Sequence, residues 1–315
     1  MPHYAIGVDV GGTKVAGGVV DCTTGEVLLR AVIPTKAKRG GAAVLADCVA
    51  LADRLQQQAH TQGKQIAGIG MGVCELVDPG GNVTSAYNFD WRGISVQEQL
   101  ATIAPAVVES DVRAAALAEA RYGAGAQFNL FCYITVGTGI SCCFMQEGKP
   151  LAGARGNALV LASMPLTTTC TTCGAVLNPI LEEFAAGPAL LARYQQATGR
   201  ALPNGPALFA ASAANDRTAT AILHSAGAAL GNSVAFLCNI LDPAAVIVGG
   251  GLGLAGGVYW EAFVEATRAH IYADDTRALP ILPAALNVDA GLIGAAAAVE
   301  RLYQNAAAVR QANLS

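Results

Sequence analysis

The chain has 315 residues, enough for one large domain or, as we expect, two lobes. Its 19 Lys and Arg against 23 Asp and Glu give a formal net charge of −4, which argues against a protein that binds nucleic acid through its phosphates. Hydrophobic residues make up 53% of the chain. The sequence nevertheless has no uninterrupted apolar stretch of about 18 residues, so we do not expect a membrane-spanning helix. Nine scattered Cys and the absence of a signal-peptide pattern predict a cytoplasmic protein with no membrane or nucleic-acid partner.

The first part of the chain alternates between predicted strands and helices. Three apolar runs in series with short connections predict an antiparallel meander, and they are residues 4–10, 15–21 and 26–33. Apolar residues at helical spacing predict a helix over 42–62, followed by a strand at 66–73. A further strand at 106–109 leads into an Ala-rich helix over 111–122.

The same plan then repeats. Strands are predicted at 130–136, 140–146 and 244–248, with a glycine turn between the first two. The predicted helices of this part are 180–197, 217–241, 258–271 and 288–304. The repetition predicts two duplicated α/β lobes, a smaller one over 1–112 and a larger one over 113–295, with the terminal segment 296–315 packed back on the first.

The segment DVGGTK lies in the turn between the first two predicted strands. Gly11 and Gly12 allow positive φ and a close approach of the backbone to a ligand, so that N–H groups face an anion. Thr13 and Lys14 add a hydroxyl and a cation, and Asp9 is suited to hold a metal-bound water. The pattern is not the G-x-x-x-x-G-K-[ST] loop, and the local sequence fits a phosphate-binding turn and an ordinary glycine hairpin equally well.

Two further glycine segments follow predicted strands. Gly137, Thr138 and Gly139 occupy the equivalent turn of the second repeat, and two such turns favour phosphate binding more than either does alone. Gly250 and Gly251 follow an apolar strand, where small residues would let a flat ring lie against the backbone. The alternative for this second segment is an ordinary turn from strand to helix.

A cluster of charged residues, Glu109 to Arg113, comes directly after the strand at 106–109. A carboxylate at the end of a strand, facing bound phosphates, is suited to take a proton from a hydroxyl nucleophile. Helix capping is the competing interpretation, because Ser110 and Asp111 both suit an N-cap, and the local sequence alone favours the cap.

In this order the motifs resemble those of the ROK family (repressors, open reading frames and kinases), whose sugar kinases have the actin and hexokinase type of ATPase fold. The resemblance spans nearly the whole chain. Its matching segments are DVGGTK at 9–14, VDPGGNV at 77–83 with Asn88 and Trp91, VESDVRAAALAEA at 108–120, TVGTGI at 135–140, LEEFAAGPAL at 181–190 and LDPAAVIVGGG at 241–251. The resemblance implies an α/β protein of two ribonuclease-H-like lobes with mixed sheets.

The resemblance also implies roles for single residues. Asp111 would be the general base, and the two glycine turns would hold the phosphates of ATP, with Asp9 near Mg²⁺. Gly250 and Gly251 would support the adenosine. The residues that the resemblance assigns to the sugar site are Glu75, Asn88, Ser110, Asp111, Asn157 and Glu182.

Several positions depart from the family pattern. Family kinases usually carry Gly-Glu-x-Gly-His where this chain has Leu159–Ser163, so Val160 cannot accept a hydrogen bond from a sugar hydroxyl and Ser163 is not a zinc ligand. Ser110 replaces the expected Asn, and Glu75 stands where a Gly is expected. We interpret the sugar site as rewritten, with Glu75 either supplying a carboxylate in place of the one lost at Val160 or serving as a solvated loop charge.

The zinc motif of the family is incomplete in this sequence. Cys170 and Cys173 keep a C-x-x-C pair, but a tetrahedral site needs four N or S ligands. We therefore expect no zinc, or a redox-sensitive dithiol, with the pair as a remnant of the family site.

The sequence as a whole predicts an ATP- and Mg²⁺-dependent kinase. Its substrate would be a hydroxyl group of a sugar or sugar-like polyol such as an atypical hexose, an amino sugar or a cyclitol, and its expected assembly is a homodimer. The alternative is a non-catalytic carbohydrate or nucleotide sensor that acts through protein contacts. DNA binding is not expected, because no helix-turn-helix precedes the first strand at Tyr4.

Overall fold

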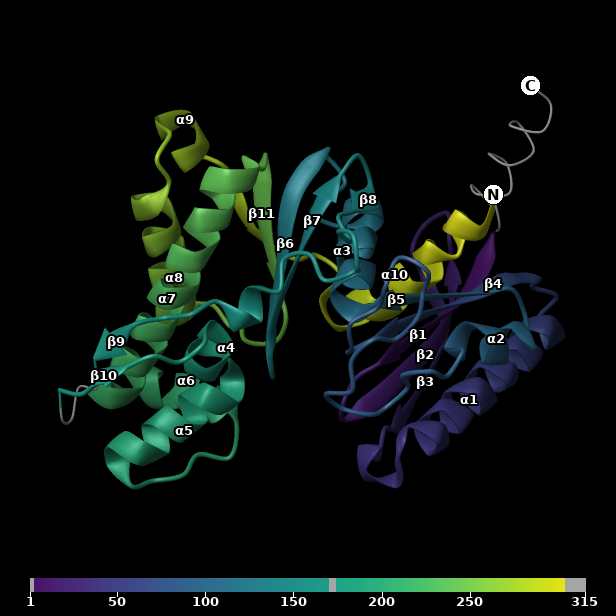
Figure 1. The fold of residues 1–315 in the computed structure, drawn as a ribbon, viewed down its shortest axis with the longest axis horizontal. Coiled ribbons are helices and arrows are strands. Elements are labelled where there is room, and N and C mark those ends of the chain that lie inside the picture. Colours follow the sequence, from purple (N-terminus) through teal and green to yellow (C-terminus); the bar gives the residue numbers. More distant parts are fainter. Residues whose placement is uncertain (1–2, 170–173, 304–315) are drawn as a thin grey trace. The chain divides into compact units, whose positions relative to one another are not determined.

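A computed structural model shows the fold of the chain and describes residues 3–169 and 174–303 (Figure 1). The described chain divides into two units, the first made of residues 3–127, 145–158 and 285–303 and the second of residues 128–144 and 159–284. The predicted boundary at residue 112 differs from this division. The helix that begins at Asp111 stays in the first unit, because it packs against the helix at the end of the chain.

The first unit contains a mixed five-stranded sheet in the order β3-β2-β1-β4-β5. Its strands are β1 (Tyr4–Val10), β2 (Lys14–Asp21), β3 (Val27–Pro34), β4 (Ile66–Val73) and β5 (Ala106–Ser110). The first three form the predicted antiparallel meander, whereas β4 is parallel to β1 and β5 is parallel to β4. The carboxyl ends of β1, β4 and β5 therefore meet at one edge of the sheet.

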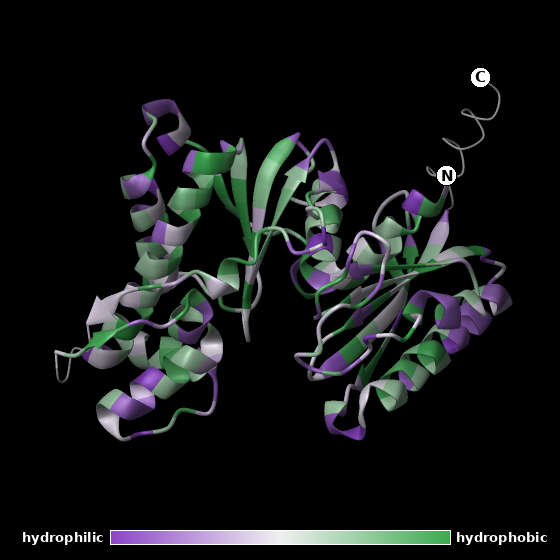
Figure 2. Ribbon diagram, viewed as in Figure 1, coloured by the Kyte–Doolittle hydropathy of each residue, from purple (hydrophilic) through white to green (hydrophobic). Residues whose placement is uncertain are grey.

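Helices cover both faces of this sheet. Apolar residues three or four apart place one side of α1 (Gly41–Thr61) against one face, as its hydrophobic stripe in Figure 2 shows. The short helix α2 (Val96–Ala101) contributes to the same core. The other face packs against α3 (Asp111–Tyr122) and α10 (Ala290–Ala298).

Small residues let α10 lie directly on the sheet. A Cβ atom added at Gly70 of β4 would fall 1.6 Å from the carbonyl oxygen of Ala295. One added at Gly294 would fall 1.7 Å from the carbonyl oxygen of Ala114 in α3. The helix predicted over 288–304 is present as α10 and a further helical stretch over 300–303, preceded by a 3₁₀ turn at Asn287–Asp289, while residues 304–315 lie outside the described residues.

The second unit repeats this plan with a sheet in the order β12-β11-β6-β7-β8. Its strands are β6 (Leu130–Val136), β7 (Ile140–Gln146), β8 (Lys149–Pro150), β11 (Ala245–Gly249) and β12 (Ile281–Pro283). β11 is parallel to both β6 and β12, as β4 is parallel to both β1 and β5. The predicted duplication is confirmed by this matching order.

The helices of the second unit differ from the prediction in the part of the chain before α7. They are α4 (Leu181–Ala185), α5 (Gly187–Thr198), α6 (Gly205–Ala213), α7 (Arg217–Leu241), α8 (Gly257–His270) and α9 (Asp274–Arg277). The single helix expected over 180–197 is broken at Ala186, which has extended backbone angles, and Pro188 begins the next helix. Helix α6 was not predicted. The strands β9 (Thr168–Thr169) and β10 (Val176–Leu177) form a small hairpin on either side of the C-x-x-C motif in the sequence, and its residues Cys170 and Cys173 lie outside the described residues.

One helix of the described chain, α7, is long and apolar enough by length and composition to cross a membrane. It has 25 residues, and Leu230 and Val234 lie fully buried in the core of the second unit. It packs along α8, so its apolar character is explained by a place in the protein core.

Candidate active site

Three carboxylates lie at the shared edge of the first sheet. Asp9 is the second-last residue of β1, Glu75 follows β4 by two residues, and Asp111 follows β5 directly. The strand register pairs Asp9 with Gly72 of β4 and Ser110 of β5 with Val73. In open α/β sheets this edge is where ligands bind.

The turn between β1 and β2 is held by backbone bonds and by a residue that the sequence did not single out. The N–H of Gly11 donates to the carbonyl of Lys14 at 3.0 Å. Thr35, buried at the end of β3, donates its hydroxyl to the carbonyl of Gly11 at 2.6 Å and its N–H to the carbonyl of Thr13 at 3.0 Å. The turn therefore has a fixed shape, with Thr13 and Lys14 exposed.

The glycines of this turn are required for a different reason than expected. Neither Gly11 nor Gly12 has a positive φ, so that expectation is wrong. A Cβ atom at Gly12 would instead lie 2.7 Å from Oδ1 of Asn88. Glycine at this position makes room for the Asn88 amide beside the turn.

Asp9 is half-buried below the turn. Burial raises the pKa of its carboxyl to about 6, and the charge of Lys14 partly opposes this shift. A Cβ atom at Gly291, at the start of α10, would lie 2.8 Å from Cγ of Asp9, so the helix begins against the carboxylate. Mg²⁺ keeps several waters and uses one or two carboxylates together with substrate phosphates, so a carboxylate such as Asp9 suits the role that the resemblance gives it.

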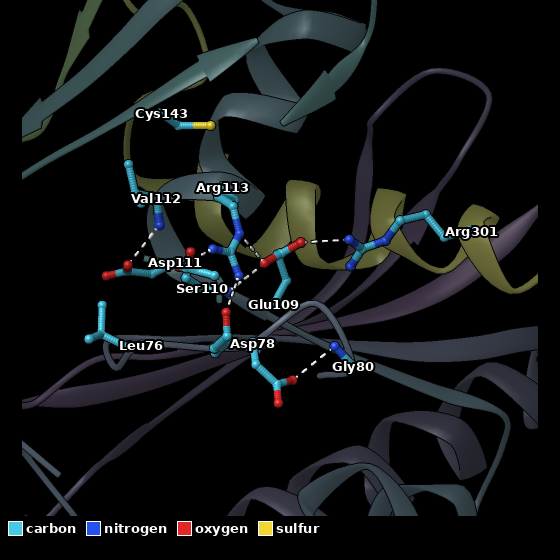
Figure 3. Close-up of polar contacts among 12 residues, drawn as sticks. Leu76, Asp78, Gly80, Glu109, Ser110, Asp111, Val112, Arg113, Cys143 and Arg301 are labelled. Carbon is cyan, nitrogen blue, oxygen red and sulfur yellow. Dashed lines mark hydrogen bonds and ion pairs between the residues drawn. The ribbon is translucent and has the colours of Figure 1, made fainter. Parts of the chain in front are cut away.

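Asp111 is the first residue of α3, and its Oδ1 accepts the N–H of Val112 at 2.7 Å (Figure 3). Burial raises the pKa of Asp111 to about 7, and the charges of Asp9 and Glu75 act in the same direction. Ser110 occupies the N-cap position, but its side chain makes no capping bond, and its buried Oγ has no hydrogen-bond partner. The capping interpretation is therefore wrong for Ser110.

Glu75 is buried, with 4% of its surface exposed, so the interpretation as a solvated loop charge is wrong. Its carboxylate accepts the hydroxyl of Ser85 and the backbone N–H groups of Tyr87, at 2.9 Å, and of Asn88, at 2.5 Å. The Asn88 side chain then donates to the carbonyl of Cys74 at 3.1 Å. Glu75 thus fixes the loop that carries Asn88.

In the second unit, the turn between β6 and β7 is closed by the N–H of Gly137, which donates to the carbonyl of Gly139 at 2.9 Å. Glu182 of α4 lies at this turn: its Oε2 accepts the N–H of Ile140 at 2.7 Å. A Cβ atom at Gly139 would fall 2.6 Å from the same oxygen. The structure therefore brings Glu182, which the resemblance assigned to the sugar, together with the second phosphate motif.

The glycines after β11 lie against the same turn. Gly250 has a φ of +82°, and a Cβ atom there would fall 2.3 Å from the carbonyl oxygen of Val136. A Cβ atom at Gly251 would meet nothing within 4 Å, so the backbone there is open. The two motifs that the sequence assigned to phosphates and adenosine are thus adjacent in the second unit.

The comparison with known families agrees with this arrangement. The model of the ROK family matches residues 5–301, which is nearly the whole chain. The chain belongs to the ROK family. The resemblance drawn from the motifs, and the two-lobed actin and hexokinase type of fold that it implied, are confirmed.

Individual ROK proteins match over most of their length. The glucokinase of Streptomyces coelicolor is 30% identical over 92% of this chain and 96% of its own. The N-acetylmannosamine kinase of Escherichia fergusonii is 28% identical over 92% of this chain and 96% of its own. A ROK glucokinase from Streptomyces griseus, solved in complex with glucose and AMPPNP, aligns with a TM-score of 0.77 and 28% identity, covering 93% of this chain and 98% of that one.

The segment that departs from the ROK pattern is irregular. Leu159 has a φ of +60°, and a 3₁₀ turn at Leu161–Ser163 follows. Val160 is 46% exposed and offers no hydrogen bond to a sugar. Asn157, in the loop before it, is exposed, while the preceding Gly156 is buried.

The zinc prediction stays a prediction, because Cys170 and Cys173 lie outside the described residues. Within residues 3–169 and 174–303, no three His, Cys, Asp or Glu side chains are grouped so that they could hold a metal ion.

Proposed function

We propose that this ROK protein is an ATP-dependent kinase that phosphorylates a hydroxyl group of a sugar or sugar-like polyol. The observation that carries the proposal is Asp111: a carboxylate at the end of β5, with a pKa raised to about 7 and next to the unpaired hydroxyl of Ser110. A base with a pKa near the working pH is the group that general base catalysis needs. Kinases among the ROK relatives support the same activity.

In the proposed reaction, Asp111 accepts the proton of the sugar hydroxyl as its oxygen forms a bond to the γ-phosphorus. The bond between the γ-phosphorus and the bridging oxygen breaks, and ADP leaves with that oxygen. The proton on Asp111 then passes to solvent. Phosphoryl transfer needs little covalent help, so the other residues act by alignment and by stabilising charge.

In the first unit, the turn Gly11–Lys14 is assigned to phosphates of ATP. In the second unit, taken by itself, the turn Gly137–Gly139 receives the same assignment. Backbone N–H groups and the Lys14 ammonium group are the donors these turns offer. Gly250 and Gly251 are assigned to the adenosine. Mg²⁺, when bound with ATP through Asp9 and waters, neutralises charge on the phosphates.

In the first unit, the sugar site is assigned to Asn88, Ser110, Asp111 and Asn157, with Glu75 acting through the loop that it holds. Glu182, in the second unit, keeps the sugar role that the resemblance gives it. Ser110 presents a short hydroxyl where ROK kinases usually have an Asn amide, so the site is wider there. Val160 removes a carboxylate that ROK kinases use for sugar hydroxyls. Both changes favour a substrate other than plain glucose, such as an amino sugar, another hexose or a cyclitol.

The test is to mix the purified protein with Mg²⁺ and ATP, add one candidate at a time, and follow ADP release. The panel contains glucose, mannose, N-acetylmannosamine, N-acetylglucosamine and inositol. Sugar-dependent ADP release that Asp111→Asn abolishes supports the kinase. The exposed Asp90, paired with Arg92 in the same unit, supplies the control Asp90→Asn.

A non-catalytic sensor is the second candidate, and the observation in its favour is the apolar segment at Leu159–Ser163. Sugar binding by calorimetry without ADP release for any member of the panel would support the sensor and contradict the kinase.

We also propose that the protein is a cytoplasmic homodimer that pairs through its second unit. Phe236 and Ile240 of α7 are 54% and 60% exposed and lie one turn apart, and such an apolar face favours an interface. Light scattering at micromolar concentration should give the mass of two chains, and Phe236→Asp should give that of one. A single-chain mass for the unchanged protein would contradict the dimer.

A further inference from the structure

Arg113, in the first turn of α3, is a buried cation that donates to three acceptors. Its guanidinium side chain is 6% exposed. Nε donates to Oε1 of Glu109, Nη1 donates to the carbonyl of Gly156 at 2.7 Å, and Nη2 donates to the carbonyl of Val77 at 2.7 Å (Figure 3). A buried charge is tolerated only when it is paired and hydrogen-bonded, so these contacts must form together.

The three acceptors belong to three different segments of the first unit. Glu109 is the second-last residue of β5, directly before Ser110 and Asp111. Val77 lies two residues after Glu75, at the start of the loop that leads to Asn88. Gly156 directly precedes Asn157. Each segment that bears an assigned sugar-site residue of this unit is therefore tied to one guanidinium group.

The position of Arg113 is itself fixed from the other side. Glu109 accepts the N–H of Ser110 at 2.9 Å through Oε1, and its Oε2 accepts Nη1 of Arg301, near the end of the described chain, at 2.6 Å. Figure 3 shows Glu109 between the two arginines. A carboxylate held by both arginines cannot turn away, so the direction of the Arg113 side chain is fixed.

The two loops that Arg113 joins also touch each other through their backbones. Gly156 has a φ of +79°, and a Cβ atom there would fall 1.9 Å from the carbonyl oxygen of Val77. That carbonyl is the one that Nη2 of Arg113 binds. A planar guanidinium group can reach two carbonyls and a carboxylate at once, whereas a lysine ammonium group has no such fork.

We infer that Arg113 is a positioning residue, which sets the relative placement of Asp111, the Asn88 loop and Asn157 and so determines sugar affinity and turnover. The inference rests on the proposed function for its meaning in catalysis. Arg113 contacts no reacting atom in this scheme. A small displacement of groups that align a phosphoryl acceptor lowers the rate strongly, so loss of the guanidinium group should act on the sugar and leave ATP binding unchanged.

The experiment compares Arg113→Met and Arg113→Lys with a control on the same helix. Arg121→Met is that control, because Arg121, near the end of the same helix, pairs with Glu300. For Arg113→Met we expect kcat/KM for the sugar to fall about 10- to 100-fold with the KM for ATP within about twofold. Arg113→Lys should restore a minor part of the loss, and Arg113→Ala should regain activity when guanidinium ion is added at millimolar concentration.

A second measurement does not depend on activity. Hydrogen exchange should rise in residues 75–89 and 151–158 of Arg113→Met and stay unchanged in β1 and β2, with no such rise in Arg121→Met. If the unchanged protein turns over no sugar, the proposed function fails, and this exchange pattern still decides the positioning role. The inference is overturned if exchange in both loops is unaltered, or if the KM for ATP changes as much as that for the sugar. Should Arg113→Met not fold, Arg113→Lys gives the same two readouts.

Discussion

The two units share one topology but present different chemistry at the equivalent edge of each sheet. In the first, the parallel strands β1, β4 and β5 end near Asp9, Glu75 and Asp111. In the second, the corresponding strands β6 and β11 end at glycines, Gly137 and Gly249–Gly251. The repeated fold thus offers side-chain charge in one copy and bare backbone in the other.

The difference has an electrostatic consequence. In the first unit, burial of Asp9 and of Asp111 raises the pKa of each carboxyl group. At the glycine turn of the second unit lies Glu182, whose Oε2 accepts the backbone N–H of Ile140. One topology therefore carries carboxyl groups of raised pKa in the first unit and a turn of glycine backbone in the second.

The largest expected effect is a loss of turnover when Asp111, the proposed base in the first unit, is replaced. Asp111→Asn should lower kcat about 10²- to 10⁴-fold, because general base catalysis contributes that much, while ATP affinity stays unchanged. ADP release and nucleotide binding by calorimetry measure the two quantities. Asp90→Asn should keep full activity. A kcat within a few-fold of the original would contradict the role of Asp111 as the general base.

The second prediction concerns pH. Asp111 must be deprotonated to act, so kcat/KM should rise with pH to a plateau above about 7 and be roughly 100-fold lower at pH 5. The free energy of unfolding should respond in the opposite sense. Because the folded pKa of Asp111 lies above its ordinary value of 3.8, the native state binds the proton more tightly, and this contribution to stability falls as pH rises from about 4 to about 7.

Both pH effects belong to one carboxyl group, so one variant tests both. Chemical denaturation at pH 4.5 and pH 7.5 should show a smaller difference for Asp111→Asn than for the unchanged protein. A rate profile that is flat between pH 5 and pH 8 would contradict the assignment of the base.

The third prediction concerns the glycines that follow β11 in the second unit. Gly250→Ala places a Cβ atom 2.3 Å from the carbonyl of Val136 at a φ of +82°, and such strain costs about 1–3 kcal/mol. Stability measured by denaturation and ATP affinity should both fall, the affinity by roughly 5- to 100-fold. Gly251→Ala is the matched control for stability, since its Cβ meets nothing within 4 Å. It should lower ATP affinity alone, and an unchanged affinity would remove Gly251 from the adenosine site.

The smallest effect is expected for Glu75, which holds the loop that carries Asn88. Glu75→Gln removes the charge of the group that accepts the Ser85 hydroxyl and the Tyr87 and Asn88 N–H groups. A hydrogen bond to a charged group is worth about 1.5–3 kcal/mol in net terms, and one between neutral groups about 0.5–1.5 kcal/mol. The KM for the sugar should rise several-fold, with the KM for ATP unchanged. Equal changes in both constants would indicate general destabilisation.

Periodicity and turn chemistry were sufficient to predict most elements of the fold. The strands of the first sheet agree with the sequence within a residue or two, and α3 begins and ends where its Ala-rich pattern does. The break at Ala186 was missed although Pro188 signals it. The boundary between the units was misplaced, because the packing of α10 against α3 joins residues nearly 180 positions apart and leaves no local signal.

The candidate site divides in the same way. Motif order identified Asp9, Asp111 and the glycine turns. The sequence did not reveal that Glu75 is buried, since this depends on the return of the chain to Ser85, or that Arg113 meets Gly156. Long-range contacts of this kind follow from tertiary structure and not from spacing.

The place of α10 also determines the order in which the molecule can assemble on the ribosome. Leu292 and Ala296 complete a core with Ala5 and Val20, so this side of the first sheet is covered by α3 alone until α10 has been synthesised. At about 5–20 residues per second, the helix that closes it emerges on the order of ten seconds or more later. Residues 128–284 can complete their own core in that interval, so the amino-terminal half of this protein reaches its native state last.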